Sequence, residues 1–191
     1  LHISFNNFKL RHICVFSIKK LMKSKKNLVL LGMMGSGKSI IGKLISKKLK
    51  LKFFDIDNVI EKEAHMNIAE IFSKKGENFF RNLEEKITIK YLNTSNNVIS
   101  LGGGGFMNDK IRKEVITNHY SFWLNLNISA LLTRIRKNKK RPIVLTSSDS
   151  KIVELINNRA KVYVKAQFKI NCNVLTKTEI VKKILKLYEH N

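Results

Sequence analysis

One segment carries most of the information about the fold of this chain, and it reads Leu28-Val29-Leu30-Leu31-Gly32-Met33-Met34-Gly35-Ser36-Gly37-Lys38-Ser39. Its first four residues are apolar, which is typical of a strand that is buried on both faces of a parallel sheet. The strand pattern then breaks into a glycine-rich turn that ends in Lys-Ser, with the spacing G-x-x-x-x-G-K-[ST]. The segment therefore predicts a P-loop, the phosphate-binding turn of many nucleotide-binding proteins.

The turn has the residue types that are needed to wrap a backbone around phosphate groups. Gly32, Gly35 and Gly37 permit positive φ angles and let backbone N–H groups approach a ligand closely. Lys38 would reach the β- and γ-phosphates, and the Ser39 hydroxyl would bind Mg²⁺ directly. The alternative interpretation is a glycine turn that binds no ligand.

A helix is predicted directly behind the turn, because apolar residues recur there at helical spacing from Ile40 to Leu49. The positive N-terminus of that helix would face the phosphates. The predicted nucleotide-binding residues of this segment are Gly32, Gly35, Ser36, Gly37, Lys38, Ser39 and Ile40.

Length and composition restrict the class of protein. The 191 residues suit one α/β domain, and no apolar run approaches the length of a membrane span, so we expect no membrane partner. Cys14 and Cys172 lie far apart without C-x-x-C spacing. They indicate neither a disulfide framework nor a zinc site, which fits a reducing, cytoplasmic compartment.

The formal net charge of +23 resembles that of a nucleic-acid-binding protein, but its make-up argues against that function. The cations are mostly lysines scattered through the predicted helices, and Asn and Ile are also abundant. These three residue types share A/T-rich codons, so mutational bias explains the balance without a polyanionic partner. We therefore expect no nucleic acid to be bound.

Residues 1–25 form a basic leader without acidic residues, and three interpretations of it stay open. It is an organelle-targeting presequence, an additional helix, or sequence that is dispensable and lies upstream of a start at Met22. Residues 26–191 are then predicted to form a single domain.

A pair of carboxylates follows the next predicted strand, Leu51 to Phe54. Alternation along an extended chain would place Asp55 and Asp57 on one side, beside the phosphate loop at the carboxyl end of a parallel strand. One would bind Mg²⁺ through water, and the other would orient or deprotonate an attacking hydroxyl. The alternative is that one of them only caps a helix that begins near Asn58.

Helical patterns follow over residues 59–64, 68–75 and 77–93, separated by Asn67 and Gly76. Because no strand intervenes, they form a helical excursion over about 56–93 between two strands of the sheet. Arg81 and Glu84 are three residues apart and would pair on one helix face, which is usually a surface interaction.

A second glycine run, 102–105, follows a buried strand over 98–101. Consecutive glycines are entropically costly, so the run suggests a backbone pressed against a ligand, with an ordinary loop as the alternative. Further strands are predicted over 119–124 and 168–171, and further helices over 128–136, 152–164 and 179–188. The polar segment of about 138–151 would be a mobile lid. The pattern predicts a three-layer α/β/α sandwich with a five-stranded parallel sheet.

These motifs together resemble the shikimate kinase family, which are small kinases with the nucleoside-monophosphate-kinase-like P-loop fold. The resemblance runs from about Lys26 to the C-terminus. The motifs agree in order and spacing: Gly32-x-x-Gly35-x-Gly37-Lys38-Ser39, Asp55-x-Asp57, Met66-Asn67-Ile68-Ala69-Glu70-Ile71-Phe72, Gly76-Glu77, Phe80-Arg81-x-x-Glu84, Gly102-Gly103-Gly104, Arg141-Pro142 and Arg159-x-x-x-Tyr163.

The resemblance implies ATP-dependent phosphorylation of the 3-hydroxyl of shikimate, in the route to chorismate and the aromatic amino acids. It implies that Asp57 binds the reacting hydroxyl and acts as base, and that Arg81 and Arg159 clamp the substrate carboxylate. The glycines that it places against the substrate are Gly102, Gly103 and Gly104.

Further roles follow from the same resemblance. Arg134 would lie against the adenine, and Arg141 of the lid would approach the transferring phosphoryl group, where it acts together with Lys38 in catalysis. Asp55 would contact Mg²⁺ through water. Glu84 would orient Arg81, and Phe80 would wall the substrate ring. The expected protein is a cytoplasmic monomer with one Mg²⁺ per subunit and ATP as co-substrate.

The chain departs from the family pattern at His65, at Asn67 and over residues 171–174, where the family has a Thr-Asp-type turn near the adenine. Two rival functions are considered. One is another small-molecule kinase of the same fold, such as a gluconate kinase, which should lack the combined Arg81, triple-glycine and Arg159 set. The other is a basic P-loop protein that binds nucleic acid, which should show clustered cations with interleaved aromatic residues.

Overall fold

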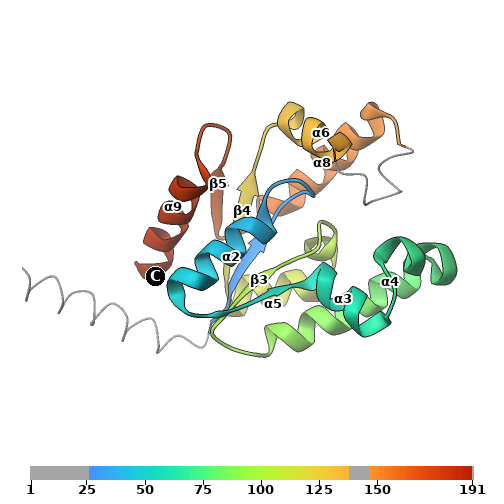
Figure 1. Ribbon diagram of the computed structural model, residues 1–191, viewed down its shortest axis with the longest axis horizontal. Helices are drawn as coiled ribbons and strands as arrows, with labels where there is room; N and C mark the ends of the chain where they lie inside the picture. The colour runs from blue at the N-terminus through green and yellow to red at the C-terminus, as the bar shows by residue number, and fades with distance from the viewer. Residues whose placement is uncertain (1–25, 138–146, 191) are drawn as a thin grey trace, which may run out of the picture.

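The protein is a three-layer α/β/α sandwich around one parallel sheet (Figure 1). The computed structural model describes residues 26–137 and 147–190. Five strands form the sheet in the order β2-β3-β1-β4-β5, and every pairing is parallel. The strands are β1 (Leu28–Leu31), β2 (Lys52–Asp55), β3 (Asn97–Ser100), β4 (Tyr120–Asn125) and β5 (Phe168–Asn171). The predicted fold class and sheet are confirmed.

The central strand β1 explains why its sequence is a continuous apolar run. It lies between β3 and β4, and its four residues, Leu28 to Leu31, are at most 1% exposed. A strand that is covered by helices on both faces has no polar side, so alternation is lost. Because the P-loop follows β1 directly, it lies at the carboxyl edge in the middle of the sheet.

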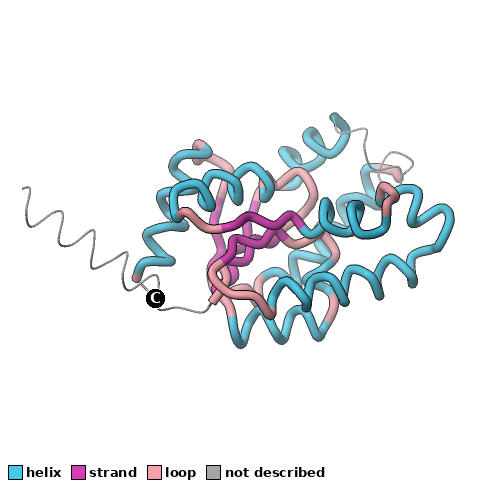
Figure 2. The backbone as a smooth tube through the Cα atoms, turned by 60° about the horizontal axis from the view of Figure 1, so that its bottom comes forward, coloured by secondary structure: helices cyan, strands magenta, loops and turns pink. Residues whose placement is uncertain are grey.

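Helices cover both faces of the sheet, as the magenta strands between cyan helices show in Figure 2. On one face, α2 (Lys38–Leu49) and α9 (Lys177–Glu189) pack side by side. On the other face, α5 (Asp109–Asn118) packs against both α4 (Ile68–Leu92) and β4. The helix α6 (Ile128–Lys137) contacts α8 (Asp149–Tyr163).

The helical excursion consists of α3 (Ile56–Ala64) and α4, which pack against each other. Asn67 forms a capping box with Glu70, in which each side chain accepts the other residue's backbone N–H, at 2.9 and 2.8 Å. Gly76 interrupts α4 with φ 82° and ψ 169°, a conformation that favours glycine. The predicted breaks at Asn67 and Gly76 are therefore confirmed.

The last three residues of the predicted lid form regular structure. Residues 149–151 make the first turn of α8, and the Ser148 side chain accepts a hydrogen bond from the Lys151 N–H. Arg136 at the end of α6 donates to Asp149 through Nε at 2.9 Å and to Ser147 O through Nη2 at 2.8 Å. Residues 138–146 of the predicted lid, with Arg141, lie outside the described residues, as does the predicted leader.

Two further features complete the architecture. A short 3₁₀ helix, η1 (Gly105–Met107), and α5 join β3 to β4, and neither was predicted from the sequence.

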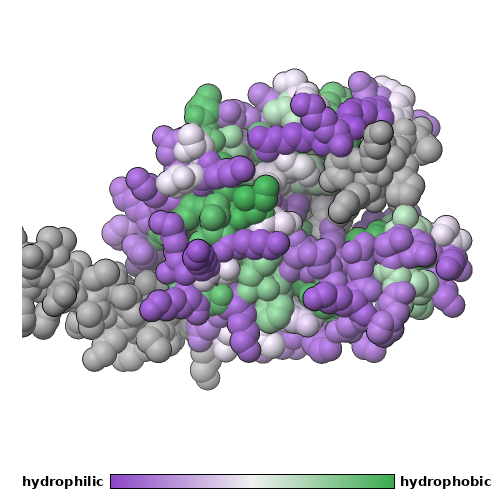
Figure 3. Space-filling view, in the orientation of Figure 1, coloured by the Kyte–Doolittle hydropathy of each residue, from purple (hydrophilic) through white to green (hydrophobic). Residues whose placement is uncertain are grey.

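Polar side chains dominate the face seen in Figure 3, although Ile40 and Leu44 of α2 stay exposed at 49% and 39%. Among the helices of the described residues, none is long and apolar enough to cross a membrane.

Candidate active site

The P-loop has the backbone that its glycines predict. Gly32, Gly35 and Gly37 have φ angles of 141°, 79° and 95°, which L side chains rarely adopt. The Lys38 ammonium donates to Gly32 O at 2.8 Å and to Met33 O at 3.0 Å, so the loop closes around its own lysine. Helix α2 begins at Lys38, and its N-terminus therefore points into the loop.

A cavity of about 490 Å³ opens in front of the loop. It is lined by the P-loop, both predicted carboxylates, the end of β3, and residues of the β4–α6 and β5–α9 connections: Met34, Gly35, Ser36, Gly37, Lys38, Ser39, Ile40, Ile41, Asp55, Asp57, Ser100, Leu101, Leu126, Arg134, Cys172, Leu175, Lys177 and Ile180. Within the described residues, the buried Ser36 Oγ has no hydrogen-bond partner. A buried hydroxyl with no partner beside a ring of N–H groups suits a bound phosphate.

Two side-chain oxygens of the kind that binds hard cations lie together at the N-terminus of α2. The Ser39 hydroxyl donates a short hydrogen bond to Asp55 Oδ2. Burial raises the pKa of the Asp55 carboxyl above its ordinary value of 3.8, and the Ser39 hydrogen bond opposes that shift. Within the described residues no cluster of three or more His, Cys, Asp or Glu side chains forms a metal site. A hydroxyl and a carboxylate are oxygen donors, and such a pair fits Mg²⁺ that shares its coordination with nucleotide phosphates.

The predicted geometry of the carboxylate pair is wrong in one respect. Asp55 ends β2, but Asp57 lies in the first turn of α3, so alternation along a strand does not place it. Both side chains still line the same cavity, because α3 begins directly at the carboxyl edge of the sheet. Asp55 also takes the N-cap position of α3, yet its carboxylate binds Ser39 instead of serving only as a cap.

The second glycine run is pressed against four charged side chains. A methyl group on Gly102 would lie 2.6 Å from Asp57 Oδ1 and 2.7 Å from Glu84 Oε1. A methyl group on Gly103 would lie 3.2 Å from Arg159 Nη1, and one on Gly104 would lie 2.5 Å from Arg81 Nη1. The backbone of the run thus brings together groups from α3, α4 and α8. The four charged side chains belong to Asp57, Arg81, Glu84 and Arg159.

Arg81 is held by two carboxylates. Its Nη1 donates to Glu84 Oε2 at 2.7 Å, and its Nε and Nη2 donate to Glu77 Oε1 at 3.2 and 3.1 Å. Glu84 is 3% exposed, so this is not the surface pair that spacing alone suggests. Burial raises the pKa of Glu84 above its ordinary value of 4.5, although the Arg81 guanidinium opposes that shift.

Phe80 supports the same arginine from below. It is 4% exposed, its ring packs on Phe72 at a centroid distance of 4.7 Å, and the Arg81 guanidinium lies 5.1 Å over it. The ring therefore belongs to the core, and its contact with the guanidinium helps to hold the Arg81 side chain in position. Its contact with a substrate ring stays a prediction.

Arg159 lies between the two glycine-rich loops. Its Nη1 lies 3.7 Å from the sulfur of Met33 in the P-loop. One turn later on α8, the buried hydroxyl of Tyr163 donates to Gly103 O at 2.5 Å. Tyr163 ends the motif Arg159-x-x-x-Tyr163, but no role was predicted for it. The i, i+4 spacing from Arg159 was the signal for a shared helix face.

The far end of the cavity was predicted least well. Arg134 was predicted there, and its Nη1 donates to Gly35 O at 3.2 Å. The apolar walls, Leu126, Cys172, Leu175 and Ile180, were missed because they are ordinary core residues in sequence. The atypical residues over 171–174 hold two loops together, since Asn173 Oδ1 accepts the Asn127 N–H at 2.7 Å.

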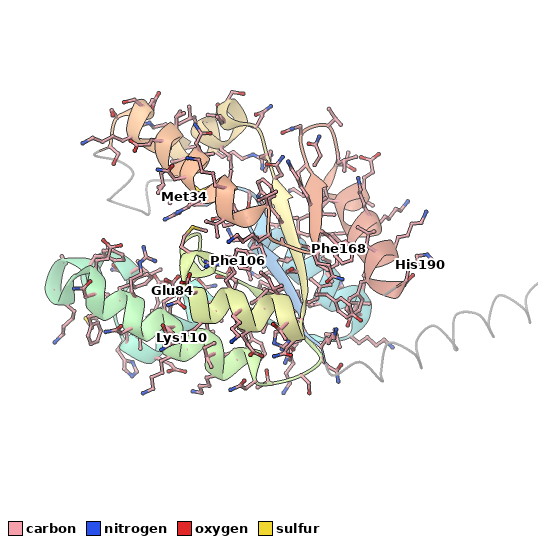
Figure 4. All side chains as sticks on the ribbon, turned by 180° about the vertical axis from the view of Figure 1, so that it is seen from behind. Met34, Glu84, Phe106, Lys110, Phe168 and His190 are labelled. Atoms are coloured by element: carbon pink, nitrogen blue, oxygen red, sulfur yellow. The ribbon has the colours of Figure 1, made fainter. Side chains whose placement is uncertain are left out.

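The predicted residues therefore form two neighbouring groups with one member in common. The cavity contains the P-loop, Asp55 and Arg134, while the second glycine run contacts Arg81, Glu84 and Arg159. Asp57 belongs to both. In Figure 4, Met34 and Glu84 lie on one side of the strands, away from Phe168 and His190. Chemically, a carboxylate between a phosphate loop and two arginines suits transfer of a phosphoryl group to a hydroxylated acid.

Known proteins were compared by sequence and by structure. The family profile described as Shikimate kinase matches residues 34–189. A shikimate kinase of Bartonella henselae is 36% identical over 184 residues, which cover 94% of this chain and 88% of the relative. A shikimate kinase of Thermodesulfovibrio yellowstonii is 39% identical over 165 residues, which cover 86% of this chain and 95% of the relative.

Solved structures agree with the sequence relatives. A shikimate kinase from Acinetobacter baumannii in complex with shikimate superposes with a TM-score of 0.83 at 27% identity, over 89% of this chain and 96% of that one. A gluconokinase from Sinorhizobium meliloti has a TM-score of 0.51 at 15% identity, over 87% of this chain and 93% of that one, which shows the shared fold alone. The match to the family profile and the relatives above 30% identity over most of both chains lead to one conclusion: the chain belongs to the shikimate kinase family.

Proposed function

We propose that this protein transfers the γ-phosphoryl group of ATP to the 3-hydroxyl of shikimate, which yields shikimate 3-phosphate and ADP. The observation that supports this proposal best is the position of Asp57. Its carboxylate lines the cavity of the P-loop and lies against Gly102, beside the glycines that contact Arg81 and Arg159. A substrate hydroxyl bound at Asp57 would face the nucleotide, while the two arginines would hold the carboxylate of the same substrate.

The acid substrate would be oriented by its carboxylate. Arg81 and Arg159 come from different helices and lie on either side of the second glycine run. Two guanidinium groups bind a carboxylate with several charge-assisted hydrogen bonds, which fix both position and orientation. Glu84 would hold Arg81 in place, and the backbone of Gly103 and Gly104 would lie against the ring hydroxyls.

Asp57 would then act on the reacting hydroxyl. As the hydroxyl oxygen forms its bond to the γ-phosphorus, the bond from phosphorus to the β–γ bridging oxygen breaks, and the hydroxyl proton passes to the Asp57 carboxylate. The main contribution of the protein is to position the reacting groups. Alignment and charge stabilisation account for most of the lowering of the barrier to such a transfer.

The nucleotide would be bound by the P-loop and by arginines of α6 and the predicted lid. Lys38 and the P-loop N–H groups would bind the β- and γ-phosphates, and Arg134 would lie against the adenine. Ser39 and Asp55 would hold Mg²⁺, which neutralises phosphate charge when it is bound. Arg141, outside the described residues, would approach the transferring group from the lid and stabilise its developing charge.

A coupled assay of ADP release tests the proposal. The purified chain should release ADP with shikimate and Mg²⁺, but not with gluconate or nucleoside monophosphates. Folded protein that shows no shikimate-dependent release would refute the function. Arg141→Ala should lower the rate constant of the chemical step, and an unchanged rate constant would refute the role of that arginine. We also infer a cytoplasmic monomer, which size-exclusion chromatography with light scattering tests in part.

A further inference from the structure

A buried tyrosine outside the proposed chemistry connects the loops of the site. Tyr163, at the end of α8, is 1% exposed, and its hydroxyl donates to the carbonyl oxygen of Gly103 at 2.5 Å. Gly103 is itself buried, in the middle of the glycine run. A buried carbonyl and a buried hydroxyl that satisfy each other are strongly constrained, because losing either partner leaves the other without a hydrogen bond.

The tyrosine ring has little freedom to move. Its centroid lies 5.9 Å from that of Trp123 on β4 and 6.4 Å from that of Phe106 in η1. Burial raises the pKa of Tyr163 to about 12, so the hydroxyl keeps its proton and remains a donor at physiological pH. The hydroxyl is therefore a fixed donor to the Gly103 carbonyl, and it also accepts a hydrogen bond from the Arg159 side chain.

That peptide group lies against the substrate-binding arginine of the same helix. Arg159 lies one turn before Tyr163, and a methyl group on Gly103 would lie 3.2 Å from Arg159 Nη1. On its other side, Arg159 Nη1 lies 3.7 Å from the Met33 sulfur, and the Tyr163 hydroxyl lies 4.0 Å from the same atom. Gly103 and Met33 thus both lie beside the Arg159 guanidinium, and the Tyr163 hydroxyl contacts both residues.

We propose that Tyr163 is a positioning residue, which holds the Gly103 peptide against Arg159 and thereby sets the geometry in which the acid substrate is bound. The proposal rests on the proposed function, because it concerns the same binding site. The tyrosine touches neither the phosphates nor the reacting hydroxyl in this arrangement. Its effect should therefore fall on the binding of the acid substrate, with little effect on the nucleotide or on the chemical step.

The test is Tyr163→Phe in the full chain, which removes the hydroxyl and keeps the ring. With one buried hydrogen bond lost and the Gly103 carbonyl free to turn, KM for shikimate should rise about tenfold. The kcat and the KM for ATP should each stay within about twofold of the unsubstituted chain. Tyr188→Phe is the matched control, since it removes the hydroxyl of a tyrosine on α9 that is 5% exposed. The control should change none of the three constants.

Each outcome decides the matter. If Tyr163→Phe leaves KM for shikimate within twofold, or raises both KM values equally, the positioning role is refuted. If the variant unfolds at the assay temperature, the same constants are measured at a lower temperature at which thermal unfolding shows the variant to be folded, and an unchanged KM for shikimate there refutes the proposal. An unsubstituted chain without shikimate-dependent ADP release refutes the proposed function, and this inference with it.

Discussion

The tight packing of Gly102 makes it the most informative position to perturb. Gly102→Ala introduces a methyl group 2.6 Å from Asp57 Oδ1 and 2.7 Å from Glu84 Oε1. Ordinary van der Waals contact begins at 3.4 Å, so the two oxygens must retreat by about 0.8 and 0.7 Å. The φ angle of Gly102 is not among the positive ones, so the backbone itself accepts alanine.

Those displacements affect catalysis much more than folding. Overpacking of a buried site costs about 1–3 kcal/mol of stability, which a domain of this size tolerates. A misplacement of about 1 Å in a group that orients the reacting atoms costs about 100-fold in rate. We expect Gly102→Ala to lower kcat about 100-fold, because Asp57 moves, and to raise KM for shikimate, because Glu84 no longer holds Arg81.

Gly105→Ala is the matched control, three residues along the same run. A methyl group there would lie 3.4 Å from Glu84 Oε1 and 3.8 Å from Leu101 Cβ, which are ordinary contacts. Coupled ADP-release kinetics and thermal unfolding should be measured on both variants. If kcat of Gly102→Ala lies within threefold of that of Gly105→Ala, Asp57 does not act on the reacting hydroxyl from the observed position, and the reasoning fails.

Three further predictions test other parts of the site and fold. Arg81→Lys should raise KM for shikimate about 10- to 100-fold at an unchanged KM for ATP, because one ammonium group cannot replace the charge-assisted hydrogen bonds of the planar fork; equal affinity in a titration with shikimate would contradict this. Asp55→Asn should raise the Mg²⁺ concentration for half-maximal activity about 10- to 100-fold, and an unchanged Mg²⁺ titration would exclude Asp55 from the metal site. Burial lowers the pKa of His119 below its ordinary 6.5, so the unfolded chain takes up a proton that the folded chain resists. The free energy of unfolding in urea should therefore fall by at most about 1.4 kcal/mol per pH unit as the pH drops below about 6.5. His119→Gln should reduce this pH dependence, and an unchanged dependence would assign the effect to other groups.

Much of the fold was predictable because its signals are local. The apolar run before Gly32 required a strand that is covered on both faces, and the five predicted strands occur within one or two residues of their expected positions. Asn67 and Gly76 mark real interruptions, since one completes a capping box and the other has a positive φ. Helix α5 was missed although Asn108 accepts from two backbone N–H groups at its start. That cap was not distinguished from the loop that follows the glycine run.

The site was predictable by residue type but not by arrangement. Asp57 was assigned to the correct edge of the sheet for an incorrect reason, because its helix starts two residues earlier than expected. Arg81 and Glu84 were expected to pair, but only the fold shows that Glu84 is buried against Gly102 while Arg81 lies against Gly104. The contact of Tyr163 with Gly103 joins residues that are 60 positions apart. Such contacts depend on how α8 packs against η1, which no local pattern encodes.

The different use of arginine and lysine explains how so basic a chain can have a specific site. Lysine ion pairs such as Lys90–Glu63 and Lys110–Glu85 lie at the surface, where lysine side chains are 64% and 77% exposed and pairs contribute little. Arginines instead hold several fixed acceptors at once, as Arg81 does with two carboxylates and Arg112 does with the carbonyls of residues 106 and 107. A planar fork keeps its geometry when it is partly desolvated, whereas an ammonium group offers a point charge. Under the proposed function, specificity for an acid substrate would therefore reside in fixed guanidinium donors, while the diffuse lysine charge would supply only a salt-dependent attraction for anions.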